Sequence, residues 1–135
     1  MKYKISVVVP VYNEEENLNR AVVSLINLLK KECKDYEIII VNSDSNDNTK
    51  KIADRLCREY KKVRAIHQKE RKGFGNGLRE GYKNCKLDLV CYMDADLPYN
   101  VSELKKAFPF IDNYDAVIGY RTGERENLMR VLMSI

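Results

Sequence analysis

Short apolar runs alternate with amphipathic segments along the whole chain. The first run, ISVVV at residues 5–9, is dense in β-branched side chains. Runs of this kind are typical of strands that are buried on both faces. The pattern predicts five strands, at residues 5–9, 37–41, 63–66, 87–93 and 114–119.

Between these runs, apolar residues recur at the three- and four-residue spacing of a helix. The first helix is predicted to start near Glu14, and its apolar positions are Leu18, Ala21, Val22, Leu25 and Leu29. The same spacing predicts helices around residues 52–60, 78–85 and 104–111, and a further helix begins at 124–135. Strands that alternate with helices indicate an α/β fold with a mostly parallel sheet.

Composition narrows the class of protein. The chain has 135 residues, which is one domain or part of one, and 44% of them are hydrophobic. The net charge of +4 suits anionic small molecules or the surface of an acidic membrane, and it is too weak and too dispersed to indicate a nucleic-acid partner. We expect no signal peptide, and no run approaches the ~20 apolar residues that cross a bilayer.

The cysteines do not suggest a metal site. Cys33, Cys57, Cys85 and Cys91 form no CxxC pair, and the single His67 has no ligand spacing to any of them. We therefore expect no zinc. The cysteines are interpreted as small buried hydrophobic residues of a cytoplasmic protein, and His67 as a structural histidine.

The most informative segment is Asp94-Ala95-Asp96, which follows the fourth predicted strand. Residues i and i+2 of a strand point the same way, so the two carboxylates can converge on one cation. Mg²⁺ is usually shared between one or two carboxylates and the phosphates of a substrate. The segment suggests a divalent ion that holds a nucleotide diphosphate, and the alternative is a solvated acidic turn.

Polar loops also follow the first two predicted strands. After the first, Pro10 ends strand pairing, Tyr12 offers a face for a base, and Glu14 can accept a hydrogen bond from a base or ribose. The alternative is a helix entry capped by Asn13, with Glu14–Glu16 complementing the helix dipole.

After the second strand, short polar side chains fill residues 42–49. Asn42, Ser43 and Asp44 are candidates for contacts with ribose and base. The alternative is a turn that leads to a helix capped by Asp47 or a neighbouring Asn.

Two further segments carry weaker signals. The glycines from Gly73 to Gly77 suit a close backbone approach to a ligand or a flexible rim, and they follow the wrong strand for a dinucleotide fingerprint. The preceding cations at residues 69–72 either face phosphates or form a solvated charge run. Arg121, after the fifth predicted strand, is either a phosphate ligand or a surface residue.

Taken together, these segments resemble glycosyltransferase family 2 and its GT-A fold. The resemblance is carried by VVVPVYNEEENL at residues 7–18, VNSDSNDNT at 41–49, GFGNGLREG at 73–81 and YMDADL at 92–97. VIGYR at 117–121 is similar to the subgroup that makes polyprenyl-phosphate sugars, such as dolichyl-phosphate mannose. The resemblance implies a three-layer α/β/α fold, with residues 1–135 as the nucleotide-sugar-binding part and the acceptor side truncated.

The resemblance also implies a reaction, the transfer of a sugar from a UDP- or GDP-linked donor to an acceptor. The acceptor that the resemblance implies is a polyprenyl or dolichyl phosphate. The reaction would be inverting and would depend on Mg²⁺ or Mn²⁺. The resemblance implies that Pro10, Tyr12 and Glu14 contact the nucleoside, and that the loop after the second strand contacts base and ribose. It implies that Asp94 and Asp96 bind the metal at the diphosphate. Ala95 would contact the nucleotide, and Arg121 would contact phosphate.

One departure from the family pattern concerns base recognition. The family usually carries Val-Asp-Asp-Gly-Ser after strand two, where this chain has Asn42, Ser43 and Asp44 in place of Asp-Asp-Gly. Base recognition therefore uses Asp44 or is altered.

Several alternatives stay open from the sequence. The chain could be a non-catalytic nucleotide-sugar-binding fragment or half of a split enzyme, with a second copy or a partner chain over the truncated edge. A sugar nucleotidyltransferase would need a glycine-rich loop after strand one, where Tyr12-Asn13-Glu14 stands. A structural α/β domain would bind metal and no nucleotide.

Overall fold

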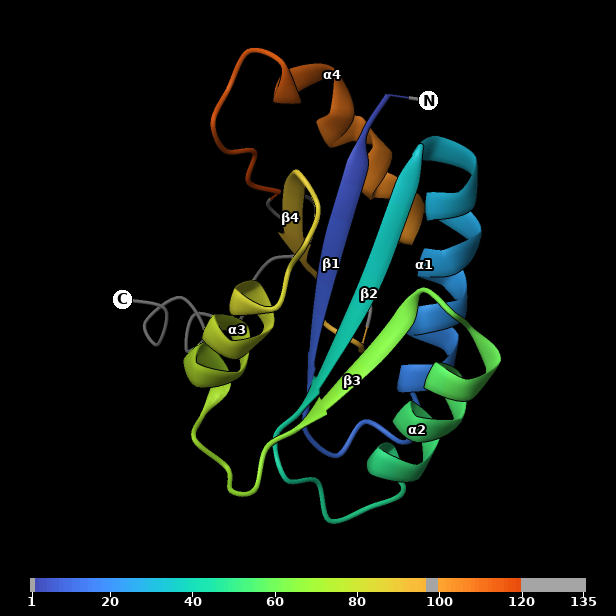
Figure 1. Ribbon diagram of the computed structural model, residues 1–135, viewed down its shortest axis with the longest axis vertical. Helices are drawn as coiled ribbons and strands as arrows, with labels where there is room; N and C mark the ends of the chain where they lie inside the picture. The colour runs from blue at the N-terminus through green and yellow to red at the C-terminus, as the bar shows by residue number, and fades with distance from the viewer. Residues whose placement is uncertain (1, 97–99, 120–135) are drawn as a thin grey trace, which may run out of the picture. The chain divides into compact units, whose positions relative to one another are not determined.

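The computed structural model describes residues 2–96 and 100–119 of the chain. It contains a four-stranded sheet made of β1 (Lys4–Val11), β2 (Asp35–Asn42), β3 (Val63–His67) and β4 (Leu89–Tyr92) (Figure 1). The strand order is β3-β2-β1-β4, and each neighbouring pair is parallel. The prediction of an α/β fold with a parallel sheet is confirmed.

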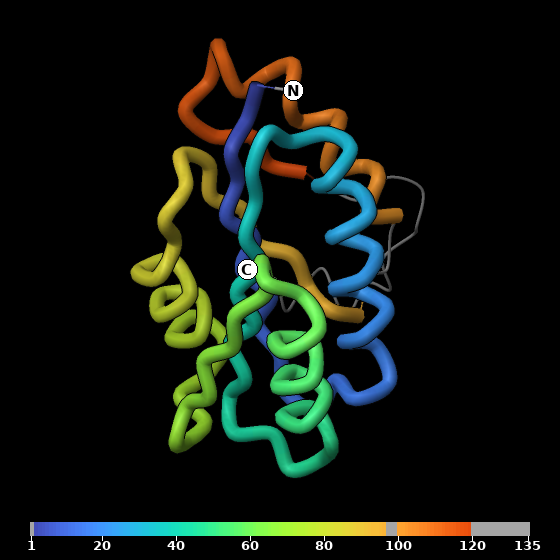
Figure 2. The backbone as a smooth tube through the Cα atoms, turned by 45° about the vertical axis from the view of Figure 1, so that its right-hand side comes forward, coloured from blue at the N-terminus to red at the C-terminus, as the bar shows by residue number. Residues whose placement is uncertain are grey.

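Helices cover both faces of this sheet. On one side, α1 (Leu18–Glu32) and α2 (Thr49–Glu59) lie next to each other, and on the other side lies α3 (Phe74–Lys83) (Figures 1 and 2). Alternate side chains of the central strands pack toward the helices on opposite faces of the sheet, because neighbouring side chains of a strand point to opposite faces. The three-layer arrangement is therefore the one expected from the apolar runs, which are buried on both sides.

The helix α3 comes very close to the sheet. Val8, Ile39 and Val41 form a buried cluster against which Leu78 of α3 packs. A Cβ atom at Gly81 would collide with the Val8 side chain, so only glycine fits there. Part of the glycine-rich segment thus serves helix–sheet packing, in addition to any contact with a ligand.

A buried polar network ties the strands together on the same face as α3. The Ser6 hydroxyl, which is fully buried, donates to Glu37 Oε1 at 2.7 Å, and Arg64 Nη2 donates to Glu37 Oε2 at 2.8 Å. The backbone N–H of Lys86 also donates to Glu37 Oε1, at 2.7 Å. This one carboxylate therefore joins β1, β2, β3 and the segment that leads into β4.

The chain divides into two compact units, Met1–Glu103 and Leu104–Ile135. All the elements above belong to the first unit. None of the helices in the described part of the chain is long and apolar enough to span a bilayer.

The prediction of a fifth strand at residues 114–119 is wrong. These residues form no strand, and Tyr114, Val117 and Ile118 are exposed. A strand needs a neighbour for its backbone hydrogen bonds, and the described residues of the second unit contain no other strand. The helix expected at 124–135 lies outside the described residues.

Helix starts also differ from the prediction, and α3 begins at Phe74 instead of near Leu78. The helix expected at 104–111 is a 3-10 helix, Val101–Ala107, followed by α4 (Phe108–Ile111). Pro109 explains the break, because its missing N–H is tolerated only in a first turn. The helix α1 begins at Leu18 instead of near Glu14, so Asn13 is not its cap. The residue before α2 is Asn48, which makes no side-chain cap, whereas Asp47 Oδ1 accepts the Thr49 N–H at 2.9 Å.

Candidate functional site

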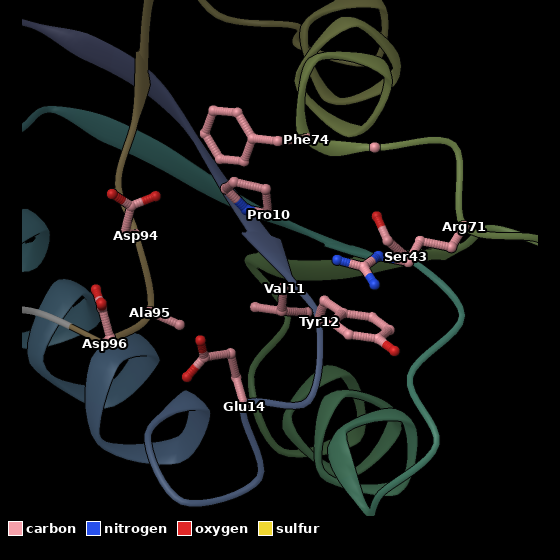
Figure 3. A pocket seen from close by; sticks show the side chains of 11 residues that line it. Pro10, Val11, Tyr12, Glu14, Ser43, Arg71, Phe74, Asp94, Ala95 and Asp96 are labelled. Atoms are coloured by element: carbon pink, nitrogen blue, oxygen red, sulfur yellow. The ribbon is translucent and has the colours of Figure 1, made fainter. Parts of the chain in front are cut away.

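A pocket of about 240 Å³ opens at the carboxyl edge of the sheet, within the unit Met1–Glu103. Its walls come from the end of β1, the loops that follow β1, β2, β3 and β4, and the start of α3. Ligands of open parallel sheets bind at this edge. The lining residues are Pro10, Val11, Tyr12, Glu14, Ser43, Arg71, Gly73, Phe74, Asp94, Ala95 and Asp96 (Figure 3).

Most of the site residues predicted from sequence meet in this pocket. Eight of them line it, namely Pro10, Tyr12, Glu14, Ser43, Gly73, Asp94, Ala95 and Asp96. Asn42 and Asp44 do not line it, and Arg121 lies outside the described residues. The four loops are far apart in the sequence, and the parallel strand order brings them to one edge.

Arg71 is the pocket residue whose position the sequence did not decide. Its guanidinium carbon lies 3.9 Å from the centre of the Tyr12 ring, a cation–π contact. Arg71 is exposed and also lines the pocket against Tyr12, whereas Lys72 pairs with Glu70 at 2.9 Å. A single Arg in a run of charges gives no sequence signal that could separate these cases.

Phe74 was also missed. It is the first residue of α3, lines the pocket, and packs edge-on against Tyr92 with ring centres 6.0 Å apart. Its position follows from Gly73, whose φ of 85° turns the chain into the helix. Such a backbone conformation favours glycine.

The two ends of the pocket differ in chemistry. Asp94 and Asp96 lie on one side, and Tyr12, Arg71 and Ser43 lie on the other, with Glu14 between them (Figure 3). Among the described lining residues, Arg71 is the only cation and faces three carboxylates. A phosphate group that entered this pocket without a counter-ion would be repelled.

The carboxylates fit a shared divalent ion better than a closed protein site. Within residues 2–96 and 100–119, no three His, Cys, Asp or Glu side chains are placed to hold a metal by themselves. Mg²⁺ and similar hard cations take one or two carboxylates and complete their shell with water and phosphate oxygens. Asp94 and Asp96, one residue apart and in the same pocket, have the right donor atoms for this arrangement.

The loop that carries Tyr12 and Glu14 is held by side chains of the loop after β2. Three consecutive backbone N–H groups each donate to one of these side chains. The pairs are Asn13 to Ser45 Oγ (3.0 Å), Glu14 to Thr49 Oγ1 (2.8 Å) and Glu15 to Asp47 Oδ2 (3.2 Å). The loop after β2 therefore sets the backbone from which Tyr12 and Glu14 enter the pocket.

The polar residues at the end of β2 are themselves engaged. Asn42 is buried and its amide donates to His67 Nδ1 at 3.2 Å, while His67 Nε2 donates to Asp54 Oδ1 at 2.8 Å. The Ser43 hydroxyl donates to Gln68 Oε1 at 2.7 Å. Both ring nitrogens of His67 have partners, which agrees with its structural interpretation.

The cysteines lie apart from this chemistry. All four are free thiols, and none of them lines the pocket. Burial raises the pKa of each, to about 11 for Cys91. These thiols stay protonated at neutral pH, as expected for small hydrophobic residues.

The family model for "Glycosyl transferase family 2" matches residues 6–130 of the chain. The chain belongs to this family. The match includes every residue that lines the pocket.

Curated relatives of the chain are sugar transferases. The chain is 35% identical, over 119 residues, to the dolichol-phosphate mannosyltransferase of Pyrococcus furiosus. The matched region covers 87% of this chain and 33% of that protein. It is 32% identical, over 136 residues, to the dolichyl-phosphate beta-glucosyltransferase of Mus musculus. Here the matched region covers 93% of this chain and 42% of that protein. The chain thus spans well under half the length of these relatives.

Solved structures agree on the fold. The mannosyltransferase PcManGT from Pyrobaculum calidifontis, in complex with GDP-Man and Mn²⁺, has a TM-score of 0.70 at 20% identity and covers 82% of this chain and 33% of that one. TarS of S. aureus, in complex with UDP-GlcNAc, has a TM-score of 0.67 at 25% identity and covers 92% of this chain and 37% of that one. The GT-A fold expected from the sequence is confirmed.

Proposed function

We propose that this chain binds a nucleotide-diphospho-sugar and forms the donor side of a glycosyltransferase that acts on a polyprenyl or dolichyl phosphate. The observation that carries the proposal is one pocket that holds Asp94 and Asp96 on one side and Tyr12 on the other. A nucleotide sugar has both chemistries, a diphosphate that needs a counter-ion and a flat base that can stack.

In this proposal each side of the pocket has its own role. Tyr12 stacks on the base, and Glu14 accepts a hydrogen bond from base or ribose, with Pro10 and Ser43 beside the nucleoside. Ala95 and Gly73 lie against the nucleotide and leave room for it, because they carry small side chains or none. Arg121 contacts phosphate and assists departure of the diphosphate. Asn42 and Asp44 remain proposed contacts to base and ribose from the neighbouring loop.

Asp94 and Asp96 are the proposed ligands of a Mg²⁺ or Mn²⁺ ion. The ion would neutralise charge that develops on the leaving diphosphate. The acidic lining supports this assignment, because three carboxylates face one guanidinium where a diphosphate has to bind. The Mn²⁺ in the complex of PcManGT, which has the same fold, supports the choice of metal.

The acceptor is proposed from the relatives and from acid–base chemistry. Relatives are named for dolichyl phosphate and undecaprenyl phosphate. A phosphate with its second pKa at about 6 is already anionic at neutral pH, so it attacks the anomeric carbon, with inversion, without a general base. Such an acceptor would bring the protein to the cytoplasmic face of a membrane.

Calorimetric titration with UDP- and GDP-linked sugars, with and without Mn²⁺, tests the proposal. We expect binding that depends on Mn²⁺ and that favours one of the two bases. The GDP-Man and UDP-GlcNAc in the neighbouring structures keep both bases in the test.

Asp96→Ala should abolish Mn²⁺-dependent nucleotide binding and leave the fold intact, since it removes a metal ligand from the surface of a pocket. Asp88→Ala is the matched control, because Asp88 is an exposed aspartate of the same unit that does not line the pocket. An Asp96→Ala variant that binds UDP and GDP as the unmodified chain does would contradict the metal site.

A further inference from the structure

The loop after β1 holds one residue, Asn13, in an uncommon backbone conformation. Asn13 has a φ of 54°, in the left-handed region that non-glycine residues rarely occupy. It stands between Tyr12 and Glu14, and both of these line the pocket. Any relaxation of Asn13 therefore moves the two side chains that we assign to the nucleoside.

The hydroxyl of Thr49 is the buried contact that opposes this relaxation. Thr49 is the first residue of α2, is completely buried, and lies 35 positions from Glu14 in the sequence. Its Oγ1 accepts the Glu14 N–H at 2.8 Å. This contact is part-buried, and a part-buried N–H that loses its acceptor costs free energy.

Asp47 fixes Thr49 in turn. Its Oδ1 accepts the Thr49 N–H at 2.9 Å, and its Oδ2 accepts the Glu15 N–H at 3.2 Å. Burial raises the pKa of Asp47, but the hydrogen bonds from Thr49 and Glu15 outweigh it and keep the pKa below its ordinary value. The carboxylate is therefore ionised at neutral pH and holds the backbone of Thr49, whose hydroxyl oxygen accepts the Glu14 N–H.

Neighbouring contacts fasten the same loop from both sides. Asn13 N–H donates to Ser45 Oγ at 3.0 Å, and Asn46 N–H donates back to Asn13 Oδ1 at 2.8 Å. Glu15 Oε2 accepts both the backbone and the side-chain N–H of Asn48, each at 2.9 Å. The two loops thus form one unit, in which Thr49 supplies the only fully buried side chain among the residues named here.

We propose that Thr49 is a positioning residue for the donor nucleoside: it touches no ligand, and it sets nucleotide affinity by holding Glu14 and, through Asn13, Tyr12. The proposal rests on the proposed function of the pocket. It adds that part of the affinity is decided by a side chain that the pocket does not contain.

The test compares Thr49→Val, which keeps the shape and removes the hydroxyl, with Thr49→Ser, which keeps the hydroxyl. Affinity for UDP and GDP in Mn²⁺ is measured by calorimetry well below the unfolding temperature of each variant. We expect Thr49→Val to weaken the preferred nucleotide by about tenfold and Thr49→Ser to stay within about threefold of the unmodified chain. In hydrogen exchange, the Glu14 amide of Thr49→Val should exchange faster.

Each outcome has one meaning. A Thr49→Val variant that is less stable but binds the nucleotide normally shows a structural role only and overturns the inference. Loss of affinity in Thr49→Ser as well as in Thr49→Val overturns the role of the hydroxyl. If the unmodified chain binds neither nucleotide in Mn²⁺, the proposed function fails, and the inference fails with it.

Should Thr49→Val not fold, Ser45→Ala makes the same test at the neighbouring N–H of Asn13. Ser45 is only partly buried, so its truncation should leave the fold intact. Weaker nucleotide binding by Ser45→Ala supports the inference, and unchanged binding overturns it.

Discussion

At the scale of single residues, the pair Tyr12 and Arg71 shows how the pocket combines its chemistries. The guanidinium lies over the aromatic ring at 3.9 Å, and it is the only cation among the described lining residues. An aromatic face with a cation beside it attracts both a flat base and an anionic group. Arg71 therefore links the two sides of the pocket.

We predict that Arg71→Ala weakens nucleotide binding by about 1 kcal/mol, because it leaves only carboxylates to meet the diphosphate. Affinity for UDP and GDP in Mn²⁺ provides the measurement. The matched control is Lys69→Ala, since Lys69 belongs to the same charged run and does not line the pocket. Equal effects of the two substitutions would mean that net charge alone, and not the place of Arg71, matters.

At the scale of elements, α3 depends on how closely it approaches the sheet. Gly81 faces Val8 of β1 and Val41 of β2, and a Cβ atom there would stand 3.2 Å from Val41 Cγ2 as well as colliding with Val8. This contact fixes the helix that begins with Phe74 at the pocket. The position of Phe74 thus depends on the packing of Gly81 as well as on the turn at Gly73.

Gly81→Ala should destabilise the chain by about 1–3 kcal/mol, because the sheet cannot make room for the added carbon without strain. The control lies in the same helix: a Cβ atom at Gly75 meets nothing within 4 Å. Gly75→Ala should therefore be neutral or stabilising, by about 0.5–1 kcal/mol, through helix propensity. Urea unfolding of both variants decides the matter, and a Gly81→Ala chain as stable as the unmodified one would contradict the packing argument.

At the scale of the whole sheet, one carboxylate connects three strands. Burial raises the pKa of Glu37, but hydrogen bonds from Ser6, Arg64 and the Lys86 N–H outweigh it, so the pKa lies below its ordinary value of 4.5. A group whose pKa is lower in the folded state stabilises the fold above its unfolded pKa. That stabilisation is lost as the pH falls through the lowered folded value.

Glu37→Gln should therefore lower the free energy of unfolding by about 1–2 kcal/mol at neutral pH. It should also reduce the loss of stability of the chain below pH 4.5, the ordinary pKa of the group. Urea unfolding from pH 7 down to acid gives both quantities. Asp35→Asn is the control, a partly exposed carboxylate of the same strand that pairs with Lys62, and it should have little effect at neutral pH. A Glu37→Gln chain with an unaltered pH profile would contradict the role of the network.

Much of the architecture was predictable because it depends on local patterns. The run VVV at 7–9 and the run IIIV at 38–41 are apolar on both faces, as expected of central strands in a covered parallel sheet. Once the strands are parallel, the loops after β1, β2 and β4 have to share one edge. This geometry brought Tyr12, Ser43 and Asp96 to the same pocket, as expected from the sequence.

The errors arose where a local pattern needed a distant partner. The run at 114–119 has the composition of a strand, yet a strand is stable only when a neighbour accepts its hydrogen bonds. Asn13 looks like a helix cap, but its N–H and its side chain are both used by the loop after β2. In each case the competing interaction lies at least 30 positions away or is absent from the described residues.

By itself, then, the sequence determined the alternation of strands and helices, the family and the acids of the carboxyl edge, because periodicity and motif spacing are properties of neighbouring residues. Only the tertiary structure decided that Arg71 stacks on Tyr12 and that Thr49 accepts a hydrogen bond from Glu14. It also decided that Gly81 allows α3 to pack closely against the sheet. These contacts join segments 35 to 73 positions apart in the chain. Such pairs produce no periodic pattern in the sequence, because local patterns do not specify which distant side chains come into contact when the strands assemble.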